Sequence, residues 1–298
     1  MRIDLHTHST ASDGTSTPAE VMSAAAEAGL DVVALTDHDT TAGWAPAEAV
    51  LPAGLTLIRG AEISCRWYDT DYPHSGFRAA TGEPERAPIG LHLLAYLFDP
   101  AEPTLAAELT RVRLAREQRA ERMVELLRAD GIELTWDEVS ALAAGGTIGR
   151  PHLARVLVER GLVSSVSEAF GPRWLGQRYR LPKEDIDVFR AVELIRAAGG
   201  VPVFAHPRAS VRGRIVPDSL IVELAKAGLA GLEADHEDHT PAQRAEVRAM
   251  AAELGLFVTG SSDFHGTNKT VKLGTYTTAP EAYHRIVEAA RGLAPVSG

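Results

Sequence analysis

The chain has 298 residues, of which 45% are hydrophobic, enough to bury a large core in one barrel-sized domain or two smaller ones. Its formal net charge is −10, so no overall positive field draws nucleic acid or an anionic membrane to it. The one cysteine, Cys65, excludes an internal disulfide, fits a reducing compartment and is expected to be a small buried side chain.

Residues 1–6 do not form a basic region followed by an apolar one, as a secretory leader does. No stretch contains the about 18 apolar residues that a membrane span needs. We therefore expect a cytoplasmic protein that does not contact membranes. An anionic substrate would need local positive charge, from bound metals or from a few arginines.

Short runs rich in Val, Leu and Ile alternate with helical patterns along the chain, which indicates α/β architecture. The first helix is marked by Thr17 as N-cap, Pro18 in its first turn, Glu20 completing a capping box and Gly29 as a C-terminal stop. The predicted strands cover residues 2–5, 31–36, 56–63, 91–97, 201–205, 230–233 and 256–259.

The segment between the fourth and fifth predicted strands shows little strand pattern. It predicts one long charged helix and three shorter ones, over residues 105–129, 136–143, 150–160 and 167–170. We expect a helical insertion over 103–196 that caps the substrate and separates two parts of one barrel, 1–102 and 197–298. Residues 69–88, rich in glycine, proline and charge, predict a long loop.

Seven strands with helices between them predict a barrel related to the eight-stranded one, in which reactive groups gather where strands end. Most of the potential metal ligands follow a predicted strand, and Glu62 closes the third. His92 is the exception, because it lies at the start of its strand; we therefore expect that strand to run antiparallel to the third. The nine candidates are His6, His8, Asp13, His38, Glu62, His92, His206, Asp263 and His265.

Two pairs among these candidates have the spacing of metal ligands. In His6-x-His8 both imidazoles lie on one face of an extended segment, because side chains alternate along it. Asp263-x-His265 repeats this geometry after three small residues, 260–262, which let the backbone pass close to a site. A lone histidine is usually structural, but these coincidences at strand ends favour a site for two or three divalent cations. Such clusters serve above all to hydrolyse phosphate esters.

Five motifs stand in order along the chain: Asp4-Leu5-His6-Thr7-His8-Ser9, Thr36-Asp37-His38-Asp39, Gly60-Ala61-Glu62-Ile63, His206-Pro207 and Ser262-Asp263-Phe264-His265-Gly266. Together they resemble the PHP (polymerase and histidinol phosphatase) superfamily. The resemblance implies a distorted seven-stranded (β/α)7 TIM-like barrel with a trinuclear metal centre. The helix start Gly149-Arg150-Pro151-His152 is similar to the branch of stand-alone phosphoesterases around 3′,5′-nucleoside bisphosphate phosphatase, also described as the RNase AM or TrpH-like group.

The resemblance also implies how the ligands are shared. One ion would bind His6, His8, Glu62 and Asp263, a second Glu62, His92 and His206, and a third Asp13, His38 and His265. Many relatives have histidine where this chain has Asp13, and a carboxylate there favours Mn²⁺ or Mg²⁺ over Zn²⁺. The ligand set contains no thiolate, so Mn²⁺, Fe²⁺ and Zn²⁺ could each bind, and we favour Mn²⁺. Asp37 is expected to orient an imidazole rather than to bind a metal.

Neighbouring metals lower the pKa of a bridging water and stabilise the attacking and leaving oxygens, so we expect a metal-bridging hydroxide as nucleophile. The predicted catalytic residues are His38, His206 and Asp263. Arg150 and His152, at a helix start that favours anions, are the predicted phosphate-binding pair, as the resemblance also implies.

Further candidates lie around the same rim. Arg208, two residues after His206, is expected to make a bidentate phosphate contact. His236 and His239 follow the sixth predicted strand and are expected to lie near the substrate. The long helix carries a run of arginines that could indicate nucleic-acid binding. Glutamates alternate with them, which favours a salt-bridged helix face instead for Arg111, Arg113, Arg116, Arg119 and Arg122.

These features predict a metal-dependent phosphoesterase acting on a small nucleotide, a 3′,5′-nucleoside bisphosphate or AMP, and also trimming short RNA from its 5′ end. No aromatic ladder is present, so a long nucleic-acid groove is not expected. Two alternatives stay open. One is histidinol-phosphate phosphatase, and the other is a non-catalytic metal-binding PHP module. The native metal, the ester that is attacked and the oligomeric state are left open as well.

Overall fold

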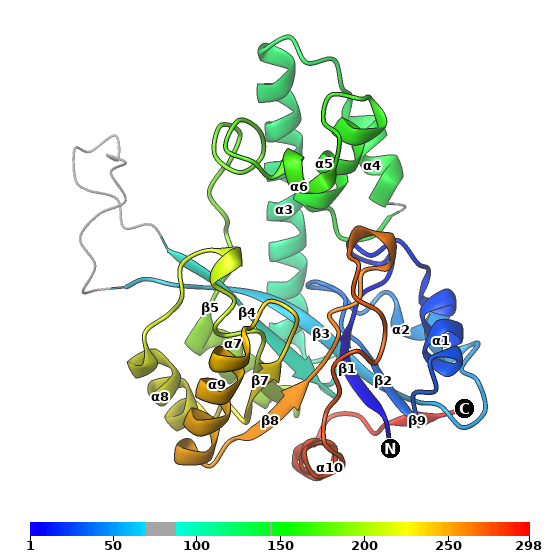
Figure 1. Cartoon of the computed structure of the whole chain (residues 1–298), viewed down its shortest axis with the longest axis vertical. Helices are drawn as coiled ribbons and strands as arrows, with labels where there is room; N and C mark the ends of the chain where they lie inside the picture. Colours follow the sequence, from blue (N-terminus) through cyan, green and yellow to red (C-terminus); the bar gives the residue numbers. More distant parts are fainter. Residues whose placement is uncertain (70–87, 144) are drawn as a thin grey trace.

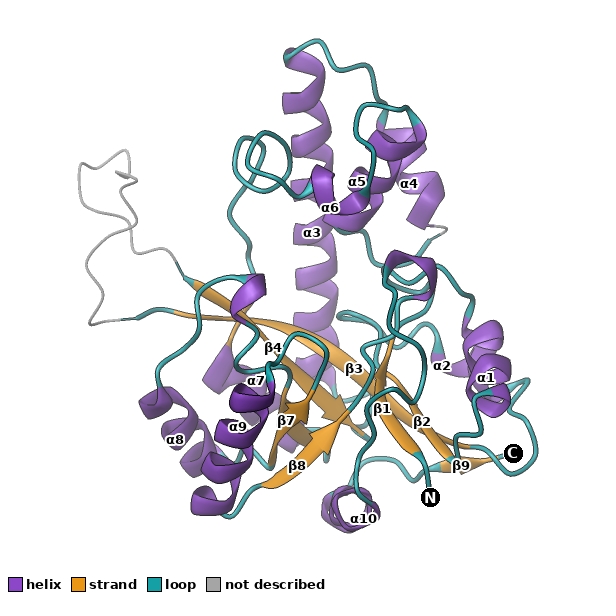
Figure 2. Cartoon of the chain, viewed as in Figure 1, coloured by secondary structure: helices purple, strands orange, loops and turns teal. Residues whose placement is uncertain are grey.

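A computed structural model describes residues 1–69, 88–143 and 145–298 of the chain (Figure 1). Nearly all of the predicted loop 69–88, with His74, therefore lies outside the described residues. The described chain forms a nearly closed barrel of strands flanked by helices, with a group of helices standing above one rim (Figure 2). Among the described residues, no helix combines the length and the apolar character needed to cross a membrane.

The barrel strands are paired in the order β1-β2-β3-β4-β6-β7-β8. A bridge between Thr7 and Phe264 brings the start of this series next to its end. The strands are β1 (Ile3–Thr7), β2 (Val32–Leu35), β3 (Thr56–Trp67), β4 (Ile89–Tyr96), β6 (Val201–Phe204), β7 (Gly231–Asp235) and β8 (Phe257–Gly260). Two short strands, β5 (Ile186–Asp187) and β9 (Val296–Ser297), pair with β3. The predicted distorted seven-stranded barrel is confirmed.

The direction of β4 is the main departure from a regular parallel barrel. It pairs antiparallel with both β3 and β6, whereas the other neighbours along the series are parallel. The register sets Ser64 opposite His92, which is the fourth residue of β4 and not its first, and which lies near the rim where β1 and β2 end. The prediction of an antiparallel fourth strand is confirmed.

Several strand ends differ from the prediction by a few residues, and two of these differences bear on the ligands. β1 continues to Thr7, so His6 lies inside the strand instead of following it. β3 continues to Trp67, so Glu62 lies in its middle and does not close it. The extension of β3 pairs with β4 and β5, partners far away in sequence, which local sequence pattern does not report.

Ten α-helices occur in the described residues: α1 (Pro18–Glu27), α2 (Trp44–Glu48), α3 (Pro103–Ala129), α4 (Trp136–Ala143), α5 (Arg150–Glu159), α6 (Val166–Ala169), α7 (Val188–Ala197), α8 (Asp218–Ala227), α9 (Pro241–Leu254) and α10 (Pro280–Ala289). Helix α1 begins with the predicted capping box, in which Thr17 accepts from Glu20 N and the Glu20 carboxylate accepts from Thr17 N. A capped, proline-initiated start of this kind defines where a helix begins.

Helix α3 connects the barrel to the helices above it (Figure 1). Its first half packs Leu105, Leu109 and Val112 into the same buried cluster as β3, β4 and α7. Its second half joins α4, α5 and α6 in a separate hydrophobic cluster formed by residues 120–181. The predicted insertion therefore has a core of its own, and α3 shares both cores. Cys65 is fully buried among the barrel strands.

Candidate metal centre

The structure brings all nine predicted ligands to one rim of the barrel, with Glu62 in the middle. The Glu62 carboxylate lies 2.7 Å from His92 Nδ1 and 3.0 Å from His206 Nε2. It also lies 3.1 Å from His38 Nδ1, on the loop after β2. The two oxygens of this one carboxylate thus face imidazoles from three chain segments. A carboxylate that bridges metal ions has this arrangement.

Four donor atoms beside Glu62 form the most compact group: His6 Nε2, His8 Nε2, Glu62 Oε2 and Asp263 Oδ1. Five of the six distances between these atoms lie between 3.1 and 3.3 Å. Ligands that surround one ion at about 2.0–2.2 Å stand about this far apart. Asp263 Oδ1 has no hydrogen-bond partner although it is buried, as expected for an atom whose partner is a cation. The four side chains therefore fit a divalent metal.

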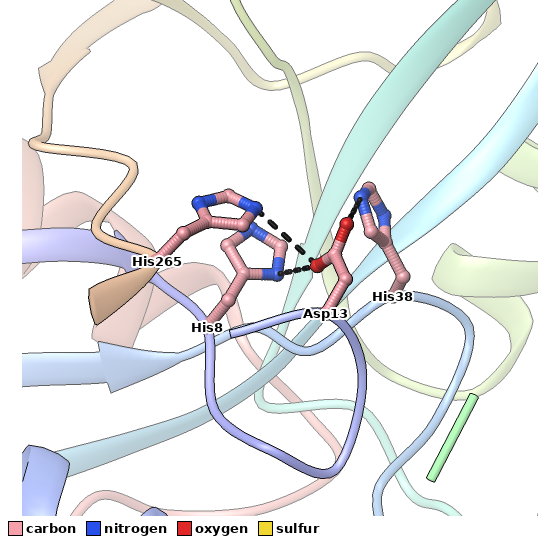
Figure 3. A group of neighbouring side chains, drawn as sticks. All are labelled: His8, Asp13, His38 and His265. Atoms are coloured by element: carbon pink, nitrogen blue, oxygen red, sulfur yellow. Dashed lines mark ion pairs between the residues drawn. The ribbon is translucent and has the colours of Figure 1, made fainter. Parts of the chain in front are cut away.

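A second group surrounds Asp13, as Figure 3 shows. The Asp13 carboxylate lies 3.3 Å from His265 Nε2, 3.7 Å from His38 Nε2 and 3.8 Å from His8 Nδ1. Donor atoms of these four residues all lie within 4.8 Å of one another, as do those of a third group, His38, Glu62 and His92. His8, His38 and Glu62 thus take part in more than one group, which suits several neighbouring ions.

The far ring nitrogens of two histidines are held by the chain, which points their near nitrogens at the centre. His6 Nδ1 lies 3.1 Å from the Glu233 carboxylate, so Nδ1–H donates and Nε2 is left as a ligand. His265 Nδ1–H donates to the backbone oxygen of Asp263 at 2.8 Å. A carboxylate or carbonyl behind a ligating imidazole fixes its tautomer and raises its basicity. Glu233 also accepts from the backbone N–H of His206 at 2.9 Å.

Asp37 organises the loop that follows β1. Its carboxylate accepts from Ser9 N at 2.8 Å, from Ser9 Oγ at 2.7 Å and from Ser12 Oγ at 2.6 Å. The Ser12 hydroxyl in turn lies 3.4 Å from His8 Nδ1. Asp37 therefore reaches an imidazole only through Ser12, and its main contacts hold the loop that carries Asp13.

The carboxylates around the centre carry charges that favour cation binding. Burial would lower the pKa of His8, but Asp263 and Glu62 raise it to about 9, so a metal ion would have to displace a proton there. Burial alone would raise the pKa of Glu62, yet the histidines around it, His92 and His38 first, hold it well below its usual range. Burial would likewise raise the pKa of Asp263, and Lys269 and His6 keep it low. Burial keeps the pKa of His38 well below its usual range, despite the nearby carboxylates. Anionic carboxylates and a neutral imidazole are the forms that bind metals.

Two predicted ligands have strained backbones. His206 has φ 35° and Asp263 has φ 54°, in the left-handed region that residues other than glycine seldom occupy. Asp39, directly after His38, has φ 54° as well. Such strain persists only where the surroundings demand it, and it concentrates at functional sites.

Sequence reasoning missed two cations at the rim. Arg212 donates to the Asp263 carboxylate at 2.6 Å and lies 3.1 Å from His206 Nε2. Lys269 also donates to Asp263, and it lies 3.7 Å from Glu237. Neither residue belongs to a recognisable motif: Arg212 ends a short 3-10 helix and Lys269 lies in a loop, and each reaches the site alone.

Arg116 departs from the predicted salt-bridged face of α3, because its partner lies outside the helix. Its side chain is buried, its Nε lies 2.9 Å from Asp39 Oδ2, and it donates to Ser64 Oγ at 2.7 Å. Asp39 also accepts from the backbone N–H of Ser64 at 2.7 Å. Arg116 therefore ties α3 to the loop that carries His38 and to β3, next to Glu62. Arg122, by contrast, is exposed and pairs with Glu125 as predicted.

The predicted phosphate-binding residues have different surroundings. His152 is buried at the start of α5, and its Nδ1 accepts from Gly149 N at 3.1 Å. Arg150 Nη1 lies 3.4 Å from the backbone oxygen of Leu175. Arg208 is buried and donates to Glu246, Asp218 and the backbone oxygen of Val216. These contacts engage the guanidinium of Arg208 within the chain and do not favour its predicted phosphate contact.

The two histidines after β7 also differ. His236 Nδ1 accepts from Asp238 N at 3.0 Å, so its Nε2–H faces the Asp263 carboxylate at 3.2 Å. His239 has both ring nitrogens engaged, with Nε2 accepting from Arg208 N at 3.0 Å and Nδ1–H donating to Ala234 O at 2.8 Å. His236 therefore borders the centre, whereas the contacts of His239 hold neighbouring backbone.

Comparison with known proteins agrees with this geometry. The PHP domain family model matches residues 4–134. The chain is 36% identical to a 5′-3′ exoribonuclease of Haemophilus influenzae over 92% of this chain and 93% of the relative. It is 34% identical to a 3′,5′-nucleoside bisphosphate phosphatase of Chromobacterium violaceum, over 88% of this chain and 87% of the relative.

A solved structure of a candidate metal-dependent phosphoesterase from Bifidobacterium adolescentis has the same fold, with a TM-score of 0.84 and 33% identity. The match covers 97% of this chain and 96% of that one. Sequence identity at this level over nearly the whole chain, together with the shared fold and the converging ligands, shows that the chain belongs to the PHP domain family.

Proposed function

We propose that this protein is a metal-dependent phosphoesterase that hydrolyses a phosphate ester of a small nucleotide. The observation that carries the proposal is the set of three overlapping donor groups, each with atoms within 4.8 Å of one another, at one end of a barrel. Two or three divalent ions, preferably Mn²⁺, would bind there. They would activate water and neutralise charge on the phosphate during displacement.

The chain's own residues supply the rest of the site. His38, His206 and Asp263 would be the catalytic ligands. His38 and His206 lie 3.1 and 3.0 Å from the Glu62 carboxylate, and Asp263 Oδ1 lies 3.2 Å from His8 Nε2. Arg212 and Lys269 place two positive charges beside Asp263, where they would help to balance a phosphate dianion. Arg212 and Lys269 thus take the phosphate-binding role that the sequence had suggested for Arg208.

The proposed substrates are a 3′,5′-nucleoside bisphosphate or AMP, together with short RNA that is degraded from its 5′ end. The relatives in H. influenzae and C. violaceum are named for reactions of this kind, which supports the choice. Arg150 and His152, at the start of α5, would contact phosphate, and residues 103–196 would cap the substrate. Because the basic residues near the rim are few, a long duplex is not the proposed substrate.

The test is release of phosphate by the purified, Mn²⁺-loaded protein. We expect hydrolysis of adenosine 3′,5′-bisphosphate, AMP or short 5′-phosphorylated RNA, with kcat/KM higher than for histidinol phosphate. Preference for histidinol phosphate would contradict the substrate class. Hydrolysis of none of these would leave a non-catalytic metal-binding protein.

Variants of two ligands sharpen this test. His38→Ala and Asp263→Ala should each lower kcat by about a hundredfold or more, since each removes a donor from the centre. The exposed, distant Arg122→Gln serves as the control and should keep the wild-type rate. Wild-type turnover by either ligand variant would remove that residue from the proposed site.

A further inference from the structure

Arg212 reaches the metal centre from an exposed loop that follows β6. Residues 210–215 are all exposed, whereas the side chain of Arg212 itself is 31% exposed. Its guanidinium donates to Asp238 at 2.5 Å and, through Nη2, to Asp263 at 2.6 Å. The other terminal nitrogen, Nη1, lies 3.1 Å from His206 Nε2. One arginine thus contacts two carboxylates and the donor atom of a candidate metal ligand.

His206 Nε2 has two neighbours that make opposite demands on it. A guanidinium offers only donors, so Arg212 Nη1 requires a lone pair on Nε2. The Glu62 carboxylate, with Oε1 at 3.0 Å, offers only acceptors and requires a proton there. Because one ring nitrogen carries either a proton or a lone pair, the two contacts cannot both be favourable at once.

The same nitrogen is the one that a metal ion would need. His206 Nε2 and His92 Nδ1 both lie against Glu62 Oε1, at 3.0 and 2.7 Å. A cation between these atoms would satisfy Glu62, and it would take the lone pair of Nε2, since a ligating imidazole is deprotonated at the ligating nitrogen. Arg212 would then find no acceptor on His206. Arg212 and this cation therefore exclude each other at Nε2.

We propose that Arg212 competes for His206 with the ion held by Glu62, His92 and His206, and so sets the affinity of that ion. The inference rests on the proposed metal centre and goes beyond the proposed function, which does not depend on how tightly each ion binds. While Arg212 donates to Nε2, His206 is not free to act as a ligand. The apparent affinity of the ion is lowered by the fraction of the protein in which Nε2 is free.

The surroundings of Arg212 allow it to release His206 without leaving the site. Asp238 and Asp263 remain as acceptors for its other nitrogens, so only the Nη1 contact is lost. The backbone around it is held by short-range hydrogen bonds, in which Arg212 N–H donates to Ala209 O and Gly213 N–H to Ser210 O. A shift of one side chain therefore suffices to free the ligand.

Lys269 provides a comparison within the same site. Its Nζ lies 2.5 Å from Asp263 Oδ2, the same oxygen that Arg212 contacts. Lys269 thus brings the same charge to the same carboxylate, but within the described part of the chain it has no contact with His206. The two residues separate the effect of charge near the centre from the effect of occupying Nε2.

The competition can be measured by titrating the protein with Mn²⁺ and following free Mn²⁺ by EPR spectroscopy. His92→Ala identifies the relevant binding step, because His92 would be a ligand of this ion alone among those proposed. Arg212→Met should tighten that step about tenfold, because it leaves Nε2 free. His236 and Lys269 still face Asp263 in this variant, so the carboxylate keeps partners.

Arg212→Lys tests whether the effect comes from occupancy or from charge. A lysine keeps the positive charge, but it lacks the two terminal nitrogens with which the guanidinium contacts Asp263 and His206 together. Its ammonium group should stay with the carboxylates, so this variant should also tighten the step. Lys269→Met, the matched control, removes a charge from the same oxygen of Asp263 and should leave the step close to its wild-type affinity.

Three results would overturn the inference. The first is wild-type affinity in both Arg212 variants. The second is tightening in Arg212→Met but not in Arg212→Lys, which would assign the effect to charge. The third is equal tightening in Lys269→Met.

Diffraction from crystals grown with Mn²⁺ gives a second readout. Where an ion is bound to His206, Arg212 Nη1 should lie beyond hydrogen-bonding distance of Nε2, at more than about 3.5 Å. An ion on His206 with Arg212 still in contact with Nε2 would contradict the competition.

The hydrolysis assay separates these results from the proposed function. If the wild type releases phosphate and the Arg212 variants bind Mn²⁺ as the wild type does, the inference fails and the proposed function stands. If the binding step shifts as expected but no ester is hydrolysed, the inference stands and the proposed function fails. Absence of Mn²⁺ binding by the wild type and the variants would overturn both.

Discussion

At the scale of single residues, Glu62 determines how the ligands share the site. It lies within 3.3 Å of imidazole nitrogens from His6, His8, His38, His92 and His206. Because these histidines come from four chain segments, one carboxylate gathers donors that lie far apart in the sequence. A carboxylate in such surroundings stays ionised and attracts cations.

Arg116 provides a prediction about stability. Arg116→Gln leaves Asp39 buried without its ion-pair partner, and breaking a buried pair in this way costs about 3–5 kcal/mol. We expect that loss in the free energy of unfolding, measured by urea denaturation. Arg122→Gln breaks an exposed pair and should cost less than about 1 kcal/mol. Equal losses in the two variants would show that the Asp39 pair is not a structural tie.

At the scale of elements, a glycine sets how closely the insertion approaches the metal loop. A Cβ on Gly146 would lie 2.5 Å from the backbone oxygen of Thr10, and the next residue, Thr147, donates from its N–H to Ala11 O at 2.8 Å. Gly146→Ala must therefore push the segment before α5 away from the loop that carries Asp13.

We expect Gly146→Ala to raise KM for nucleotides about tenfold, because it displaces Arg150 and His152 relative to the metals. Hydrolysis of 4-nitrophenyl phosphate, which needs only the metal centre, should change little. Gly90→Ala, where nothing lies within 4 Å of the added Cβ, is the control. Unchanged KM in Gly146→Ala would show that this approach does not position the substrate-binding residues.

Some features of these elements could be predicted from the sequence and others could not. The capping box at Thr17 and the antiparallel β4 were predicted because their signals are local or follow from the place of one ligand. The full length of β3 was not predicted, because its extension is stabilised by β5 and by Arg116. The nine candidate ligands were predicted from their spacing and order, and the structure gathers them at one rim. Glu233, Arg212 and Arg116 were missed because a single carboxylate or arginine gives no signal until the chain is folded.

At the scale of the whole molecule, the metal centre joins the two ends of the barrel series. His6 lies in β1 and His8 directly after it, and Asp263 and His265 follow β8, so bound ions would connect the segments where the barrel nearly closes. Cations that bind only the folded chain stabilise it by about 3–4 kcal/mol at 100 to 1,000 times their dissociation constant.

Removal of metal by a chelator should therefore lower Tm by several degrees, and Mn²⁺ should restore it. Differential scanning calorimetry before and after refilling measures this change. The Tm of His38→Ala should change less on removal and refilling of the metal than the Tm of the wild type. An identical Tm with and without metal would mean that the ions do not bridge the barrel.

The converging ligands are tested most directly by diffraction from crystals grown with Mn²⁺, with data collected on both sides of the manganese absorption edge. We predict two or three anomalous peaks among His6, His8, Asp13, His38, Glu62, His92, His206, Asp263 and His265. Absence of any peak there, or manganese bound only elsewhere on the protein, would contradict the proposed metal centre and the chemistry based on it.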